Sequence, residues 1–404
     1  MSNTPRNLLF VFCVALLFGT LVAPTAAQQN FTPIDQEIAE QEITAVYPEA
    51  GQGKLGVYRV WLPAGYNDEA NAERTYPVLL VDVANGNSHS RFPQVREWVE
   101  RNGWICVMPT DVKNGPVLDI DRNYSLIFPD IKQRFRLTPH CGIMTGMSGG
   151  SRRSTRYGNA NQDIFGGIIN NGGVNSDGAA HCKDRNMMVM VFSGTGCFNI
   201  AEIQHAINFQ SPDRCQIRLF DGGHTWGTVP MQEEAMDWMA AGLLTNFGEP
   251  EPALDLLNLL KTEIESTESQ YRRYLLMGRY VGLANSQRAF KKDADLKAIA
   301  KEYKAEVKKL SRDKELRTEL EAMAALQAIR QQYATQIGQS LNWANGSLSP
   351  PKKFGQKVIA ATDATRQQTM AALQTLAEQY PGSEAVAESQ IDVQAMEGFA
   401  KRWR

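Results

Sequence analysis

The chain has 404 residues, of which 43% are hydrophobic and 21% are charged, and its formal net charge is −2 at pH 7. This near-neutral balance gives no electrostatic basis for binding nucleic acid or an anionic membrane surface. The length exceeds that of one ordinary domain, so we expect two.

The first 27 residues are typical of a secretory signal peptide. Arg6 provides a positive charge, an apolar run extends from Leu8 to Val22, and Ala26 and Ala27 are small residues suited to cleavage. The apolar run is shorter than the roughly 20 residues that a membrane-spanning helix needs. We expect cleavage after Ala27, a mature chain without a membrane span, and a secreted or periplasmic location. An uncleaved N-terminal anchor is the alternative.

Residues 52–246 alternate short apolar segments with helical or loop segments. We predict a helix over Phe92–Asn102. The predicted strands are Tyr58–Leu62, Pro77–Val83, Trp104–Met108, Gly142–Met147, Phe165–Asn170, Met187–Phe192 and Cys215–Phe220. Most of them are continuously apolar, which suits strands buried on both faces of a mostly parallel sheet. The order of strand, helix and strand predicts an α/β layered domain.

Residues 253–404 differ in composition from the residues before them. Glycine is rare there, and Ala, Leu, Glu, Lys, Arg and Gln, which favour helices, dominate. Leu256, Leu260 and Ile264 recur every four residues and form an amphipathic stripe. We therefore predict an all-α C-terminal region. This helical region is a candidate binding site for a protein partner.

The sequence Gly146-Met147-Ser148-Gly149-Gly150 fits the pattern Gly-x-Ser-x-Gly. It follows a predicted strand and precedes a predicted helix over residues 151–158. A nucleophile on a sharp strand-to-helix turn needs neighbours without bulk, and the N-terminus of the helix favours developing negative charge. We predict that Ser148 is a nucleophile; a glycine-rich turn with a capping serine is the alternative.

His224 follows the last predicted strand in the glycine-rich sequence Asp221-Gly222-Gly223-His224. The separation of 76 positions from Ser148 to His224 leaves room for two further strands and their crossovers. A histidine in such a loop can reach the nucleophile and take its proton. We predict that His224 is the general base; a solvated loop histidine is the alternative.

These motifs, with the segment Leu62-Pro63-Ala64-Gly65-Tyr66, resemble the α/β-hydrolase superfamily, in particular the secreted esterases related to polyhydroxybutyrate depolymerases and feruloyl esterases. The resemblance extends from about residue 56 to residue 244. It implies a small or polymeric ester as substrate and no metal or organic cofactor. It also implies an oxyanion hole formed by the amides of Gly149 and, at the position of the family's His-Gly, of Gly86.

The resemblance fails at the acidic residue that completes the family's catalytic triad of serine, histidine and acid. The family places an aspartate after the penultimate strand, where this chain has Cys197. Asp177 is the predicted substitute for that carboxylate, and Asn199 is a second candidate that would hold the imidazole by a neutral hydrogen bond. If neither acts, catalysis is weak or lost. We expect Cys197 to form a disulfide with Cys182 or Cys215.

The sequence therefore predicts an exported serine hydrolase that cleaves a carboxylic ester or a related acyl bond through an acyl-enzyme on Ser148. The alternative is a catalytically degenerate binding protein of the same fold, whose helical region docks a partner. Arg152 and Arg153 are expected on a helix face, where they could also meet an acidic substrate.

Overall fold

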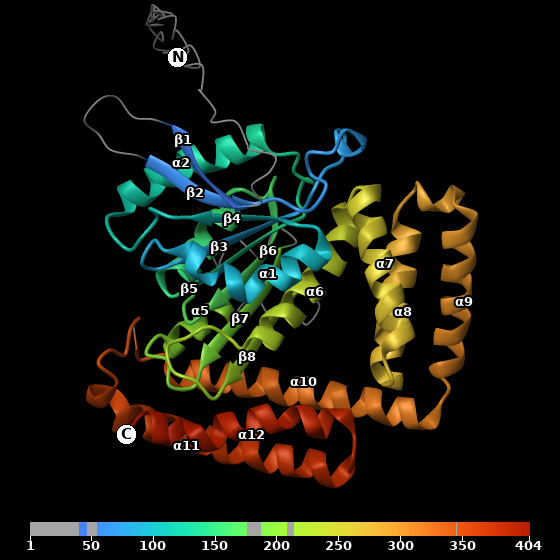
Figure 1. Ribbon diagram of the computed structural model, residues 1–404. Helices are drawn as coiled ribbons and strands as arrows, with labels where there is room; N and C mark the ends of the chain where they lie inside the picture. Colours follow the sequence, from blue (N-terminus) through green and yellow to red (C-terminus); the bar gives the residue numbers. More distant parts are fainter. Residues whose placement is uncertain (1–39, 47–54, 176–186, 208–213, 345) are drawn as a thin grey trace, which may run out of the picture. The chain divides into compact units, whose positions relative to one another are not determined.

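The computed structural model describes residues 40–46, 55–175, 187–207, 214–344 and 346–404 (Figure 1). The predicted signal peptide lies outside these residues, as do Asp177 and Cys182. The sheet and the C-terminal helices belong to one compact unit.

An eight-stranded sheet has the strand order β1-β2-β4-β3-β5-β6-β7-β8. The strands are β1 (Glu40–Val46), β2 (Leu55–Trp61), β3 (Val78–Val83), β4 (Ile105–Pro109), β5 (Gly142–Met147), β6 (Phe165–Asn171), β7 (Met188–Gly194) and β8 (Cys215–Phe220). Strand β2 pairs antiparallel with β1 and β4, and the other pairs are parallel. The predicted mostly parallel sheet is confirmed. Because β1 pairs with β2, the sheet includes residues before position 52.

Helices cover both faces of the sheet (Figure 1). They are α1 (Phe92–Asn102), α2 (Val117–Arg134), α3 (Gly149–Arg153), α5 (Ile203–Ile207) and α6 (Val229–Phe247). Side chains of β3 alternate between the two faces, as the pleat requires. Leu79 and Val81 pack in the cluster that includes α1 and α6, whereas Val78 and Leu80 pack in the cluster that includes α2. Strand β3 is therefore buried on both faces, as its apolar run predicts.

The C-terminal region is helical, as predicted. It consists of α7 (Pro250–Ser266), α8 (Gln270–Ser286), α9 (Ala294–Leu310), α10 (Lys314–Ser340), α11 (Pro351–Gln379) and α12 (Glu384–Arg402). Its apolar side chains share clusters with the sheet: Leu257 belongs to the cluster of Val81, and Phe399 belongs to the cluster of Val191. The helices therefore complete the cores on both sides of the α/β part.

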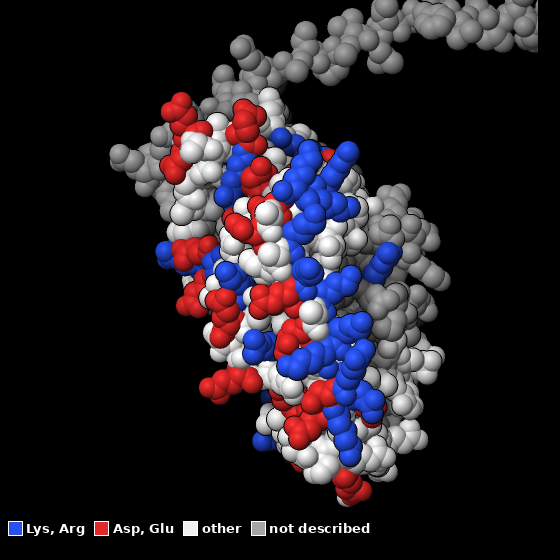
Figure 2. Space-filling view, turned by 90° about the vertical axis from the view of Figure 1, so that its right-hand side faces the viewer, with Lys and Arg blue, Asp and Glu red and all other residues white. Residues whose placement is uncertain are grey.

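The outer face over α9 carries many charged side chains, with Lys and Arg gathered toward one margin beside a mixture of both signs (Figure 2). Lys297, Lys301, Lys304 and Lys308 are exposed on one side of this helix. Within the described ranges, no helix combines the length and the apolarity that crossing a membrane requires.

Candidate active site

Ser148 lies in the sharp turn between β5 and α3. Its backbone angles are φ 59° and ψ −117°, which non-glycine residues rarely adopt. A Cβ at Gly146 would overlap the carbonyl of Gly150, and a Cβ at Gly150 would overlap the carbonyl of Asp82. Both glycines of the motif are therefore required by close backbone packing. The side chain of Ser148 makes no capping hydrogen bond to α3, so the alternative prediction of a capping serine is wrong.

The helix after Ser148 is anchored by a buried ion pair. Arg153 binds the carboxylate of Asp82 through Nε at 2.7 Å and Nη2 at 2.9 Å, and Tyr124 donates to the same carboxylate at 2.6 Å. Burial alone would lower the pKa of Arg153, but the Asp82 carboxylate raises it above its ordinary value. Arg153 is therefore a buried structural cation. Because Arg153 also borders the small pocket beside this turn, its contact with an acidic substrate stays a prediction.

Arg152 also has a carboxylate partner. Its guanidinium pairs with Glu202, with Nε 3.1 Å from Oε2, and the same Oε2 accepts the backbone N–H of Val174 at 2.9 Å. Because Glu202 is only 4% exposed, this pair ties α3 to the segments after β6 and β7. The positive charge of Arg152 is thus held close to the turn that contains Ser148.

His224 follows β8 and contacts a thiol. Its Nδ1 lies 3.1 Å from Sγ of Cys197, and the ring of Phe198 lies against the imidazole with a centroid distance of 3.9 Å. Burial, and to a smaller degree the positive charge of Arg152, lowers the pKa of His224 to about 4. The imidazole is therefore neutral at neutral pH, which is the state that a general base requires.

Cys197 is fully buried, and burial raises the pKa of its thiol to about 11. Its Sγ accepts the backbone N–H of Asn199 at 3.4 Å and lies 4.0 Å from the carbonyl oxygen of Gly172. With its S–H directed to that carbonyl, Sγ can accept the Nδ1–H of His224. This tautomer leaves Nε2 unprotonated and able to take a proton.

Two expectations about this loop are wrong. Cys197 is a free thiol, so the expected disulfide with Cys182 or Cys215 is not formed. Nδ2 of Asn199 donates to the carbonyl oxygen of Gly172 at 2.9 Å, and its Oδ1, the atom that would accept from the imidazole, is buried without a hydrogen-bond partner. The atom that contacts Nδ1 is the sulfur.

The three residues lie at one edge of the sheet. Ser148, Cys197 and His224 follow β5, β7 and β8, and the carboxyl ends of parallel strands meet at the same edge. Gly172 and Gly173, after β6, lie between them. A Cβ at Gly172 would be 3.3 Å from Nδ1 of His224, and a Cβ at Gly173 would be 2.9 Å from the carbonyl oxygen of Ser148. Ser148 and His224 therefore share one rim of the domain.

The two predicted oxyanion amides differ in their hydrogen bonding. The amide of Gly86 donates to the carbonyl oxygen of Val83 at 3.2 Å, within its own turn. Gly149 is the first residue of α3, where an amide has no intrahelical acceptor. Asn114, which the motifs did not mark, lies over Gly149: a Cβ there would be 1.7 Å from its Oδ1 and 2.9 Å from its Nδ2. Because its Oδ1 accepts from Arg153 at 3.0 Å, its Nδ2 remains as a donor.

A pocket of about 240 Å³ adjoins this turn. Its wall includes Asn114, Val117, Ile120, Gly149 and Tyr157. Arg152, Arg153 and Arg156 also line it. The pocket therefore combines apolar, amide and guanidinium groups, and it opens directly beside the residue after the predicted nucleophile.

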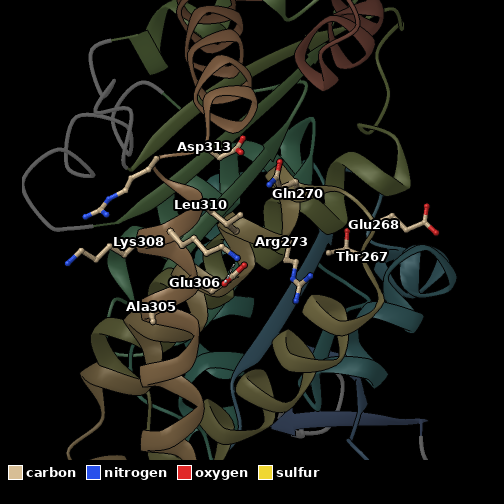
Figure 3. A pocket seen from close by; sticks show the side chains of 11 residues that line it. Thr267, Glu268, Gln270, Arg273, Ala305, Glu306, Lys308, Leu310 and Asp313 are labelled. Atoms are coloured by element: carbon tan, nitrogen blue, oxygen red, sulfur yellow. Dashed lines mark ion pairs between the residues drawn. The ribbon is translucent and has the colours of Figure 1, made fainter.

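A larger pocket, of about 1030 Å³, lies in the helical region (Figure 3). Arg273, Glu306, Lys308 and Asp313 are among its lining residues, which include no serine, cysteine or histidine. It therefore lacks the serine and histidine on which the predicted mechanism depends. In the part of the chain that the structure describes, no group of three or more His, Cys, Asp or Glu is placed to hold a metal ion.

The strand order and the strained turn at Ser148 are those of the α/β-hydrolase fold. No protein-family model and no curated protein matches the chain. Solved structures similar to it include a fluorophosphonate-binding serine hydrolase of Staphylococcus aureus, with 11% identity, 50% of this chain and 97% of that chain covered, and a TM-score of 0.39.

Two further similar structures are enzymes by their descriptions. The feruloyl esterase module from Clostridium thermocellum has 14% identity, with 50% of this chain and 87% of that chain covered and a TM-score of 0.39. An S-formylglutathione hydrolase from Agrobacterium tumefaciens has 12% identity, with 53% of this chain and 100% of that chain covered and a TM-score of 0.40.

Proposed function

We propose that this protein is an exported serine hydrolase that cleaves a carboxylic ester through an acyl-enzyme on Ser148. The observation that carries this proposal is the presence, at one edge of the sheet, of a strained serine turn and a neutral, half-buried histidine. Neither feature benefits folding by itself, because the turn costs backbone strain and the histidine is desolvated.

In the proposed reaction, Oγ of Ser148 attacks the ester carbonyl carbon while Nε2 of His224 takes the hydroxyl proton. The carbonyl oxygen becomes an oxyanion beside the Gly149 amide and the Asn114 side chain. Collapse of this intermediate breaks the carbon–oxygen bond to the alcohol, which leaves with the proton from Nε2. Water then attacks the acyl carbon while Nε2 takes its proton. The bond between the acyl carbon and Oγ breaks as this proton passes from Nε2 to Oγ, which releases the acid and restores Ser148.

We assign the place of the triad acid to Cys197 rather than Asp177. Nδ1 offers one in-plane hydrogen bond, and Sγ of Cys197 lies within reach of it. The thiol orients the ring but carries no charge to stabilise imidazolium. Loss of the carboxylate charge costs roughly four orders of magnitude in kcat in a serine-protease triad, so we expect slow turnover.

Hydrolysis of p-nitrophenyl acetate tests this proposal. We expect slow hydrolysis by the wild type, and loss of the enzymatic rate in both Ser148→Ala and His224→Ala. Ser90→Ala is a matched control, because it removes a hydroxyl from a loop serine that only bonds the backbone of its own turn. Equal rates for the wild type and Ser148→Ala would reject the proposal.

The second candidate function is a binding protein that has lost catalysis. The neutral thiol at Nδ1 favours it, because a carboxylate is the usual partner of a catalytic histidine. In this case a protein partner would bind the helical region, and the wild type would show neither ester turnover nor acyl-enzyme formation.

A further inference from the structure

Arg402, the last residue of α12, and Trp403, which follows it, contact the two loops that carry Cys197 and His224. Nε1 of Trp403 donates to the carbonyl oxygen of Thr195 at 2.7 Å, two residues before Cys197. Nε of Arg402 donates to Oδ1 of Asp221 at 2.6 Å, three residues before the histidine. Two consecutive residues near the end of the chain therefore hold two loops that come from different strands.

The packing around these contacts is tight. A Cβ at Gly196 would lie only 2.7 Å from Cβ of Arg402, so the loop approaches the helix as closely as a glycine permits. The backbone N–H of Leu348 donates to the carbonyl oxygen of Phe198 at 2.6 Å. Because the ring of Phe198 lies against the imidazole, Leu348 is a third residue of the helical region that contacts a neighbour of His224.

The chemistry of the pair explains why such support matters. A carboxylate at Nδ1 would hold an imidazole by its charge, whereas a neutral thiol is a weak acceptor. The position of the ring then depends on the loops that carry it. Arg402 and Asp221 are both exposed, and an exposed ion pair contributes little to overall stability, so its main effect is local.

We propose that Arg402 and Trp403 are positioning residues, which set the His224 imidazole toward Ser148 and so make the C-terminal helical region part of the active site. This inference rests on the proposed function. It gives the helices after residue 253 a role in catalysis that involves no partner protein.

The full-length variants Arg402→Gln and Trp403→Phe test this inference, with Arg404→Gln, an exposed arginine at the same end, as the matched control. Trp403→Phe keeps an aromatic ring but leaves the Thr195 carbonyl without its donor. We expect kcat for p-nitrophenyl acetate to fall about tenfold in each variant, with KM within about twofold, because small displacements of catalytic groups reduce rate. Arg402→Lys should restore part of the rate.

NMR titration of His224 provides a readout independent of turnover. We expect its pKa to rise from about 4 toward the ordinary value in Arg402→Gln and Trp403→Phe, because loosened loops expose the ring to water. An unchanged titration and unchanged kcat in Arg402→Gln would overturn the inference, even if Trp403→Phe fails to fold. If the wild type shows no turnover, the proposed function fails, and the titration alone decides whether Arg402 and Trp403 position the ring.

Discussion

Sγ of Cys197 lies 3.1 Å from Nδ1 of His224, where a serine hydrolase normally presents a carboxylate. The thiol is buried and neutral, and the imidazole beside it is also neutral. The pair therefore provides orientation without charge. In the proposed mechanism, His224 would take the proton of Ser148, but the imidazolium so formed would be poorly stabilised.

Replacing Cys197 by aspartate should increase turnover. A carboxylate at Nδ1 would stabilise imidazolium, and we expect kcat to rise at least tenfold, a fraction of the roughly 10⁴-fold effect of this charge in a serine-protease triad. Steady-state hydrolysis of p-nitrophenyl acetate measures the change. Cys197→Ala, which removes the contact, should lower kcat below that of the wild type.

Asp177→Asn separates the two candidates for the acid. If turnover falls in Asp177→Asn and is unchanged in Cys197→Ala, then Asp177 holds the imidazole and our assignment of Cys197 is wrong. We expect the opposite pattern, because Sγ occupies the hydrogen-bonding position of Nδ1.

The pH dependence of Ser148 acylation should differ from that of an ordinary histidine. Because the folded pKa of His224 is about 4, the imidazole stays unprotonated as the pH falls from 8 to 5, and the rate should be flat over that range. It should halve near pH 4, where the base becomes protonated. Rates of fluorophosphonate labelling at a series of pH values measure this profile. A midpoint near 6.5, the ordinary value for histidine, would contradict the account.

The ion pair between Arg153 and Asp82 should be important for stability. Arg153→Met leaves a buried, unpaired carboxylate, which typically costs about 3–5 kcal/mol of unfolding free energy. Arg156→Met on the same helical segment removes an exposed pair with Asp121 and should cost at most about 1 kcal/mol. Urea unfolding of both variants gives the comparison. Equal losses would show that the buried pair does not anchor the turn.

Asn114 should contribute to oxyanion stabilisation. Asn114→Ala removes the side chain that lies over Gly149, and we expect kcat to fall by about 10²-fold with little change in KM, as for other oxyanion donors. Lys113→Ala is the neighbouring control. A change confined to KM would instead assign Asn114 to substrate binding.

The elements with the strongest local constraints could be predicted from sequence. Strands β5 and β8 have the predicted bounds, because each is a short run ended by glycine-containing turns. The turn at Ser148 was predictable because its two glycines are dictated by steric contact. The helix after it begins at Gly149, two residues before the predicted start, and continues as a π-helical turn over Ser154–Gly158.

Other features depend on contacts that no local pattern reveals. The helix over Val117–Arg134, where Pro129 lies inside α2, has no counterpart among the predicted elements. The same holds for the strand over Glu40–Val46, which begins with three polar residues at the edge of the sheet. The contact of Cys197 with His224, and the contacts of Arg402 and Trp403 with their loops, join residues from distant parts of the chain. Only the folded structure brings these groups together.

The central claim is that Ser148 is a nucleophile activated by His224. Mass-spectrometric mapping of the residue that a fluorophosphonate modifies tests it most directly, because the probe reacts covalently with an activated serine even when turnover is slow. We expect one adduct, on Ser148, and none in His224→Ala. An adduct on another residue, or no adduct on the wild type, would contradict the claim.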